Sequence, residues 1–146
     1  AASDVYKRQG LVLADDSGLE VDALGGAPGV WSSSYGGEEG NHEKNNQRLQ
    51  QELLALGAAP QRARFRCVMV MAESGVVLAH FDGTIEGLVT AQPSGSGGFG
   101  YDPHFIPEGH QQSFADLGET VKNQLSHRAQ ALSAAVQWLR DHRDSA

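Results

Sequence analysis

The most regular pattern of apolar and polar positions lies in residues 63–72, ARFRCVMVMA. The residues at every second position, Phe65, Cys67, Met69 and Met71, alternate with Arg64, Arg66, Val68 and Val70. Alternation with period two predicts a β-strand with one buried face. The turn residues at 73–75 then predict a hairpin into a second strand over 76–81. Gly83 and Gly87 interrupt the continuation over 84–90, so we expect a bent strand or a β-bulge there.

Two further segments have the spacing of amphipathic helices. Asn41 can cap a helix over 43–56, with Gly57 as its stop and an apolar face formed by Leu49, Leu53 and Leu56. Ser126 is a natural N-cap for a last helix, whose apolar stripe is Leu132, Ala135, Val136 and Leu139. Together with the strands, these helices predict an α/β fold with a mixed, twisted sheet and flanking helices.

An acid pair follows an apolar run near the start of the chain. The run, Leu11 to Ala14, predicts a buried strand that ends at Asp15 and Asp16. Open α/β sheets place their chemistry at strand ends, and adjacent strand residues point to opposite faces. We therefore expect one acid to face a crevice and the other to anchor the loop. A polar turn without chemistry is the alternative interpretation, because the segment continues with several glycines.

A glycine-rich stretch, PSGSGGFGYDP at residues 93–103, carries two aromatic residues and an acid. Glycines allow backbone amides to approach a ligand, and the flat ring of Phe99 can stack on a nucleotide base. This composition predicts a ligand-binding loop. The alternative is a turn whose aromatic rings are buried in the core.

A basic pair, His127 and Arg128, falls in the first turn of the predicted last helix. The helix dipole favours anions at that end, so cations there are slightly unfavourable unless acceptor groups of a ligand lie opposite them. The pair therefore predicts a ligand contact, and a solvated basic turn is the alternative.

Composition narrows the classes of protein. The 146 residues are enough for one domain with its own core. A formal net charge of −7 argues against nucleic-acid binding, which needs a broad basic surface. No apolar run reaches the roughly 18 residues of a membrane helix and no signal segment opens the chain, so we expect a cytoplasmic protein with no membrane partner. A single cysteine, Cys67, excludes an internal disulfide framework and a cysteine-based zinc site.

The first nine residues, AASDVYKRQ, fit neither a strand nor a helix period. We interpret residues 1–9 as a non-native scar and exclude them from the fold. Residues 10–146 are then expected to form a single domain.

Three motifs together resemble those of one enzyme family. They are ADDSGLEVDALGGAPGV at residues 14–30, GSGGFGYDP at 95–103 and SHR at 126–128. In this order they resemble the non-canonical purine nucleoside triphosphate pyrophosphatases, also called inosine triphosphatases or XTP/dITP diphosphatases, from about Gly10 to Trp138. The resemblance implies an elongated fold with a cleft between two lobes, and a homodimer.

The resemblance also implies a reaction and a role for each motif residue. In that family, water attacks the α-phosphorus of ITP, dITP or XTP with Mg²⁺ bound, which releases the monophosphate and pyrophosphate. Asp16 resembles the general base and metal ligand, and Ser17 the adjacent substrate contact. The other implied substrate-binding residues are Phe99, Gly100, Tyr101 and Asp102 of the base-binding segment, the lysine Lys122, and the purine-reading pair His127 and Arg128.

Two departures from the family pattern bear on these expectations. Ser33 and Ser34 stand where the family often has Ala-Arg. The family also begins with a strand, a phosphate loop containing Gly, Asn and Lys, and a metal-binding glutamate, so we expect a first βα unit to be missing before Gly10. A nucleotide-binding fragment without turnover is therefore one alternative function. Another is a Maf- or Nudix-like pyrophosphatase, although residues 43–56 lack the repeated glutamates of a Nudix helix.

Overall fold

The computed structural model describes residues 3–8, 10–57, 59–96 and 99–142. One sheet has the strand order β1-β2-β3-β4-β5, and each pairing in it is antiparallel. Its strands are β1 (Ser3–Arg8), β2 (Leu11–Val21), β3 (Gln61–Glu73), β4 (Val76–Val89) and β5 (Phe105–Pro107). The predicted α/β fold is confirmed, but the sheet is not mixed among the described strands, because none of their pairings is parallel.

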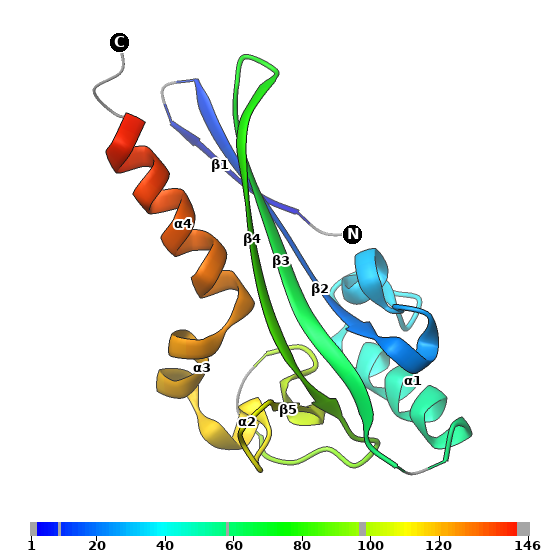
Figure 1. Cartoon of the computed structure of the whole chain (residues 1–146). Helices are drawn as coiled ribbons and strands as arrows, with labels where there is room; N and C mark the ends of the chain where they lie inside the picture. Colours follow the sequence, from blue (N-terminus) through cyan, green and yellow to red (C-terminus); the bar gives the residue numbers. More distant parts are fainter. Residues whose placement is uncertain (1–2, 9, 58, 97–98, 143–146) are drawn as a thin grey trace.

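The helices are α1 (His42–Ala55), α2 (Phe114–Leu117), α3 (Glu119–Leu125) and α4 (His127–His142), with short 3-10 turns at Asp22–Leu24, Gly29–Ser34 and Asp102–His104. Helix α4 runs alongside the long strands, and α1 and α2 lie near the end of these strands that is away from the β3–β4 hairpin (Figure 1). Both predicted caps are confirmed. Asn41 Oδ1 accepts a hydrogen bond from the Lys44 amide at 3.1 Å, and Ser126 Oγ accepts one from the Ala129 amide at 3.1 Å.

The core lies on the face of β3 that the alternating apolar residues form. Phe65 packs there in a cluster with buried Leu49 and Leu53 of α1. Farther along the same strand, Cys67 and Met69 pack against Ala131 of α4. The two clusters explain why one strand pattern predicted the buried face correctly, because residues two apart on a strand share a face.

We expected the strand to end at the acid pair, and this prediction is wrong. β2 continues through Asp15 and Asp16 to Val21, because β3 pairs with it along its whole length. The turn comes later, at Gly25 and Gly26, which have φ values of +67° and +90°. Both acids therefore project from the interior of a paired strand.

The predicted β-bulge at Gly83 and Gly87 is wrong, because the register shift between β3 and β4 lies at Met71 and Ala72 instead. β4 stays paired with β3 across both positions. The reason for glycine is close packing: a Cβ at Gly83 would lie 1.8 Å from the carbonyl oxygen of His127. At Gly87 a Cβ would lie 2.3 Å from the carbonyl oxygen of Ile106. Backbone of α4 and β5 occupies the space that side chains would take.

Two predicted apolar faces are only partly buried. In α1, Leu49 and Leu53 are buried, whereas Leu56, which follows the helix as its C-cap, is exposed. In α4, Ala135 is buried together with Ala131, whereas the rest of the predicted stripe, Leu132, Val136 and Leu139, is exposed. The close approach of α4 to β4 at Gly83 selects the small alanines for the inner side of the helix.

The expectation that the first nine residues form no regular element is wrong. Ser3–Arg8 forms β1, which pairs with residues 11–16 of β2. Gly10, at φ +84°, allows the chain to reverse between the two strands. The strand forms because the edge of β2 offers backbone hydrogen-bond partners, and the apolar pattern of a sequence does not report such pairing. A non-native origin of residues 1–9 stays a prediction.

Candidate active site

Asp15 lies on the covered face of β2 and is 4% exposed. Its Oδ1 accepts hydrogen bonds from the Ser17 hydroxyl and the Cys67 thiol, both at 3.2 Å. Its Oδ2 lies 3.0 Å from Arg128 Nε of α4. Asp15 therefore ties the start of α4 to the centre of the sheet. These contacts agree with the anchoring role expected of one of the two acids, and the catalytic role of the other acid stays a prediction.

Asp16 points to the opposite face of β2 from Asp15. Its Oδ1 is buried and has no hydrogen-bond partner in the described part of the chain. The residue lines a hollow, here called the Asp16 hollow, whose other lining residues are Ser17, Gly18, Glu20, Gly29, Val30, Arg66 and Val68. A buried carboxylate oxygen without a partner is costly, so this atom is suited to a cation, a water molecule or a substrate group.

A divalent cation fits this carboxylate only with help from outside the protein. Among the described residues, no group of three His, Cys, Asp or Glu side chains could hold a metal ion. Glu20 is the other carboxylate that lines the Asp16 hollow. Mg²⁺ commonly uses one or two carboxylates and takes its remaining ligands from water and substrate phosphates. Asp16 and Glu20 match that donor set.

The predicted base-binding segment is held together by Asp102. Asp102 is buried, and its Oδ2 accepts hydrogen bonds from the Phe99 amide at 2.7 Å and from Lys122 Nζ at 2.6 Å. Lys122 thus forms an ion pair with Asp102 in this structure. The Phe99 ring is 67% exposed and makes an edge contact with His42 of α1. The ring is therefore placed to stack on a flat ligand.

Gly100 and Tyr101 anchor the same loop rather than expose polar groups. The Gly100 carbonyl accepts a hydrogen bond from Asn46 Nδ2 at 2.9 Å. Tyr101 is buried, and its hydroxyl donates to the Ser32 carbonyl at 2.6 Å. Burial raises the pKa of Tyr101. Sequence reasoning missed His42 and Asn46, although their spacing of four residues places both on one side of a helix.

His127 and Arg128 occupy the first turn of α4, as predicted. The His127 ring stacks on Phe65 at 5.0 Å between centroids. Burial and the neighbouring Arg128 lower the pKa of His127 to about 4, so its imidazole is neutral at pH 7. Its Nδ1 is buried with no partner in the described part of the chain. A neutral ring with a vacant nitrogen can donate or accept a hydrogen bond.

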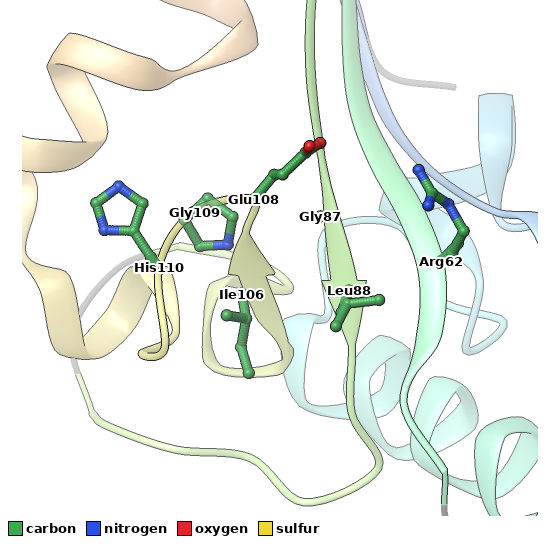
Figure 2. Close-up of a pocket in the computed structure, with 8 residues that line it drawn as sticks. Arg62, Gly87, Leu88, Ile106, Glu108, Gly109 and His110 are labelled. Carbon is green, nitrogen blue, oxygen red and sulfur yellow. The ribbon is translucent and has the colours of Figure 1, made fainter.

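The structure brings the predicted residues together in three groups. Ser17 and Arg128 meet at Asp15, and Phe99 and Lys122 meet at Asp102. Asp16 lines the hollow on the other face of β2, and Ser17 is also among the lining residues of that hollow. A separate hollow, lined by residues that include Arg62, Leu88, Ile106 and His110, contains none of the predicted site residues (Figure 2).

Comparison with known proteins decides the family. The Ham1 family model matches residues 1–138. The chain belongs to the Ham1 family. The match begins before Gly10, where the motif resemblance was expected to start, and membership excludes the Maf and Nudix alternatives. In the described part of this Ham1 chain, no helix has the length and apolar character needed to cross a membrane.

Relatives in this family include named enzymes. The chain is 49% identical over 126 residues to a dITP/XTP pyrophosphatase of Shouchella clausii, an alignment that covers 86% of this chain and 64% of the relative. It is 49% identical over 141 residues to a dITP/XTP pyrophosphatase of Porphyromonas gingivalis, covering 96% and 70% of the two chains. The chain thus spans about two thirds of the length of the relatives it matches.

Solved structures show the same fold. A HAM1 protein from Coxiella burnetii superposes with a TM-score of 0.80 at 39% identity, covering 88% of this chain and 66% of that one. The Ham1 protein of Staphylococcus aureus gives a TM-score of 0.81 at 37% identity, with coverage of 90% and 68%.

Proposed function

We propose that this chain acts as a nucleoside triphosphate pyrophosphatase, which converts dITP, XTP and ITP to the monophosphate and pyrophosphate. The observation that carries the proposal is its 49% identity to dITP/XTP pyrophosphatases, with the three motifs in order. Asp16 Oδ1 supports it, because this atom has no hydrogen-bond partner among the described residues and can orient a water molecule. Removal of such nucleotides from the pool is a cytoplasmic task, and we propose that location.

Asp16 acts on the attacking water. Its Oδ1 accepts a proton as the water oxygen forms a bond to the α-phosphorus; the bond from that phosphorus to the bridging oxygen breaks, and pyrophosphate leaves with the electron pair. Asp16 and Glu20 would hold Mg²⁺, which supplies neutralisation of the triphosphate charge when bound. Asp15, fully engaged with Ser17, Cys67 and Arg128, keeps the strand in place.

The purine base is recognised on the covered side of the sheet. The exposed Phe99 ring stacks on the base, and donors from His127 and Arg128 face its 6-carbonyl. Adenine has an amino group at that position, so one hydrogen bond from a charged donor favours hypoxanthine or xanthine by about tenfold to 150-fold. Rejection of guanine requires another contact, which we assign to its 2-amino group.

The two-lobed cleft and the homodimer remain part of this proposal. The groups at Asp16 and at Asp102 lie on different sides of β2, so one nucleotide must pass the edge of the strand to reach both. A second lobe covering that edge would enclose the triphosphate. Light scattering after size-exclusion chromatography measures the oligomer: a monomeric mass in a fully active preparation would contradict the dimer.

The decisive experiment is a substrate panel with Mg²⁺. ITP, dITP, XTP, dATP and dGTP are supplied to this chain and to a chimera in which residues 1–9 are replaced by the N-terminal segment of the Shouchella clausii relative. We expect pyrophosphate release from dITP and XTP by the chimera, with much slower release by the 146-residue chain. Tight dITP binding without turnover in both proteins would favour the binding-fragment alternative. A preference for dATP would refute the proposed specificity.

A further inference from the structure

Arg66 projects from the middle of β3 into the Asp16 hollow. It lies directly across from Gly18 of β2, which has no side chain to meet it. Asp16 and Glu20 are the flanking β2 positions on that face. Arg66 is exposed and therefore accessible to a ligand that enters the hollow.

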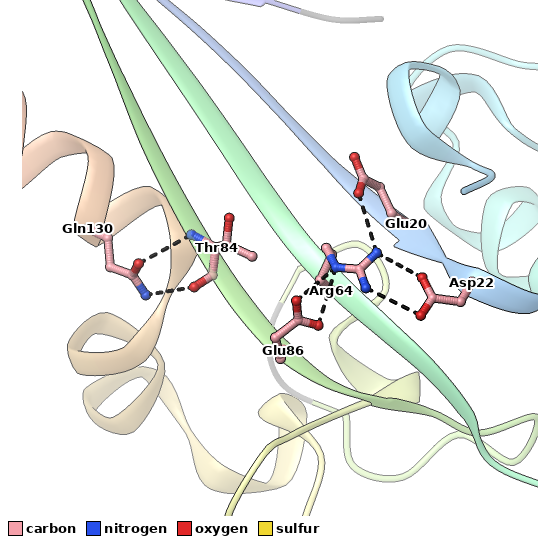
Figure 3. Close-up of polar contacts among 6 residues, drawn as sticks. All are labelled: Glu20, Asp22, Arg64, Thr84, Glu86 and Gln130. Atoms are coloured by element: carbon pink, nitrogen blue, oxygen red, sulfur yellow. Dashed lines mark hydrogen bonds and ion pairs between the residues drawn. The ribbon is translucent and has the colours of Figure 1, made fainter. Parts of the chain in front are cut away.

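No carboxylate among the described residues forms an ion pair with Arg66. Neighbouring Arg64, two residues away on the same face, contacts the carboxylates of Glu20, Asp22 and Glu86 at 3.6, 2.8 and 2.9 Å (Figure 3). In contrast, Arg66 has no ion pair or hydrogen bond from its side chain among the described residues. In a chain with a formal net charge of −7, an unpaired arginine beside the candidate catalytic carboxylate is a local site for an anion.

The hollow thus contains a carboxylate, from Asp16, and a guanidinium group, from Arg66, that each lack a hydrogen-bond partner among the described residues. Within the described part of the chain, Asp16 Oδ1 is a buried acceptor without a donor, and the Arg66 side chain is a set of donors without an acceptor. A triphosphate with its cation satisfies both, because the cation meets the carboxylate while phosphate oxygens accept from the guanidinium group in a bidentate manner. A neutral ligand would satisfy neither charge.

We propose that Arg66 binds a phosphate group of the nucleoside triphosphate, and that it is a substrate-binding residue for the phosphate tail. The inference rests on the proposed function and adds to it the residue that receives the triphosphate. In this role Arg66 binds the phosphate tail equally in the bound substrate and in the transition state, so its loss raises KM more than it lowers kcat.

The strand supplies a matched control. Arg62 lies four residues away on the same face and is also exposed, but it lines the separate hollow with His110 and not the Asp16 hollow. Arg62→Gln and Arg66→Gln therefore remove the same charge from the same strand face. Only the second removes it from beside Asp16. Both positions are exposed, so neither change should disturb the core.

The first measurement is calorimetric binding of inorganic tripolyphosphate with Mg²⁺ to the 146-residue chain, which requires no turnover. We expect Arg66→Gln to weaken binding about tenfold at low salt and less at high salt, with Arg62→Gln within about twofold of the unchanged chain. Equal losses in the two variants would show that only the overall charge matters and would overturn the assignment. Absence of tripolyphosphate binding by the unchanged chain would overturn it as well.

The second measurement separates this inference from the proposed function. In the chimera, Arg66→Gln is expected to raise the KM for dITP about tenfold and to change kcat less than threefold, while Arg66→Lys retains part of the affinity. A loss confined to kcat would refute a role in phosphate binding. Selective loss of tripolyphosphate binding without dITP hydrolysis by any protein would support the anion site and refute the proposed reaction.

Discussion

Replacing each member of the acid pair by asparagine tests the two roles at almost constant shape. In Asp15→Asn, the side-chain oxygen can still accept from Ser17 and Cys67. Its new amide group, however, must face Arg128 Nε, so two donors meet where an ion pair stood at 3.0 Å. A hydrogen bond to a charged group contributes about 1.5 to 3 kcal/mol. Because half of the Arg128 side chain is exposed, we expect a loss near the lower end, about 1.5 to 2 kcal/mol.

In Asp16→Asn the balance is reversed. Asp16 Oδ1 has no partner to lose in the described chain, so the free energy of unfolding should change by less than about 0.5 kcal/mol. Loss of the charge removes the proton acceptor and weakens the cation, and turnover of dITP should fall by at least about a thousandfold.

Two assays decide between these roles. Urea unfolding of the 146-residue chain measures stability, and pyrophosphate release by the chimera measures activity. Asp15→Asn should lower stability and reduce the dITP to dATP preference through a displaced Arg128, while it retains much more activity than Asp16→Asn. Equal catalytic losses with equal stability losses would refute the division between anchor and catalytic acid.

Three further predictions concern the packing and titration of the site. Gly83→Ala places a Cβ against the His127 carbonyl and should lower the free energy of unfolding in urea by about 1 to 3 kcal/mol. The control is Thr84→Ala, which should cost less than about 0.5 kcal/mol because Thr84 contacts Gln130 through its backbone. Similar losses in the two variants would contradict the close packing of α4. Arg64→Gln should lower the thermal midpoint by about 2 to 4 °C at low salt, more than Arg62→Gln, and the difference should shrink in high salt, because three carboxylates lose their shared cation. Burial lowers the pKa of His127 from 6.5 to about 4, so between these pH values the unfolded chain binds a proton that the folded chain does not. The free energy of unfolding should therefore decline as pH falls from about 6.5 toward 4, by at most about 3 kcal/mol from this group. An equally steep decline in a His127→Gln variant would refute the assignment.

Several features of this chain follow from the order of its residues alone. The period of two in residues 63–72 predicted β3 and its buried face, and Asn41 and Ser126 predicted the starts of two helices. These signals are local, since strand alternation and capping depend on residues only a few positions apart. The opposite directions of Asp15 and Asp16 follow for the same reason.

Only the tertiary structure decided how these elements meet. Gly83 predicted a bulge from sequence, but its lack of a side chain is required by the backbone of α4, which is more than 40 residues away along the chain. The same approach turned Ala131 inward and left Leu132 exposed, against the apolar stripe. Strand β1 and the continuation of β2 past the acids depend on pairing with partner strands. Periodicity records the preference of a segment for a face, whereas close packing and edge pairing depend on which segment lies opposite, and that information is spread over distant parts of the chain.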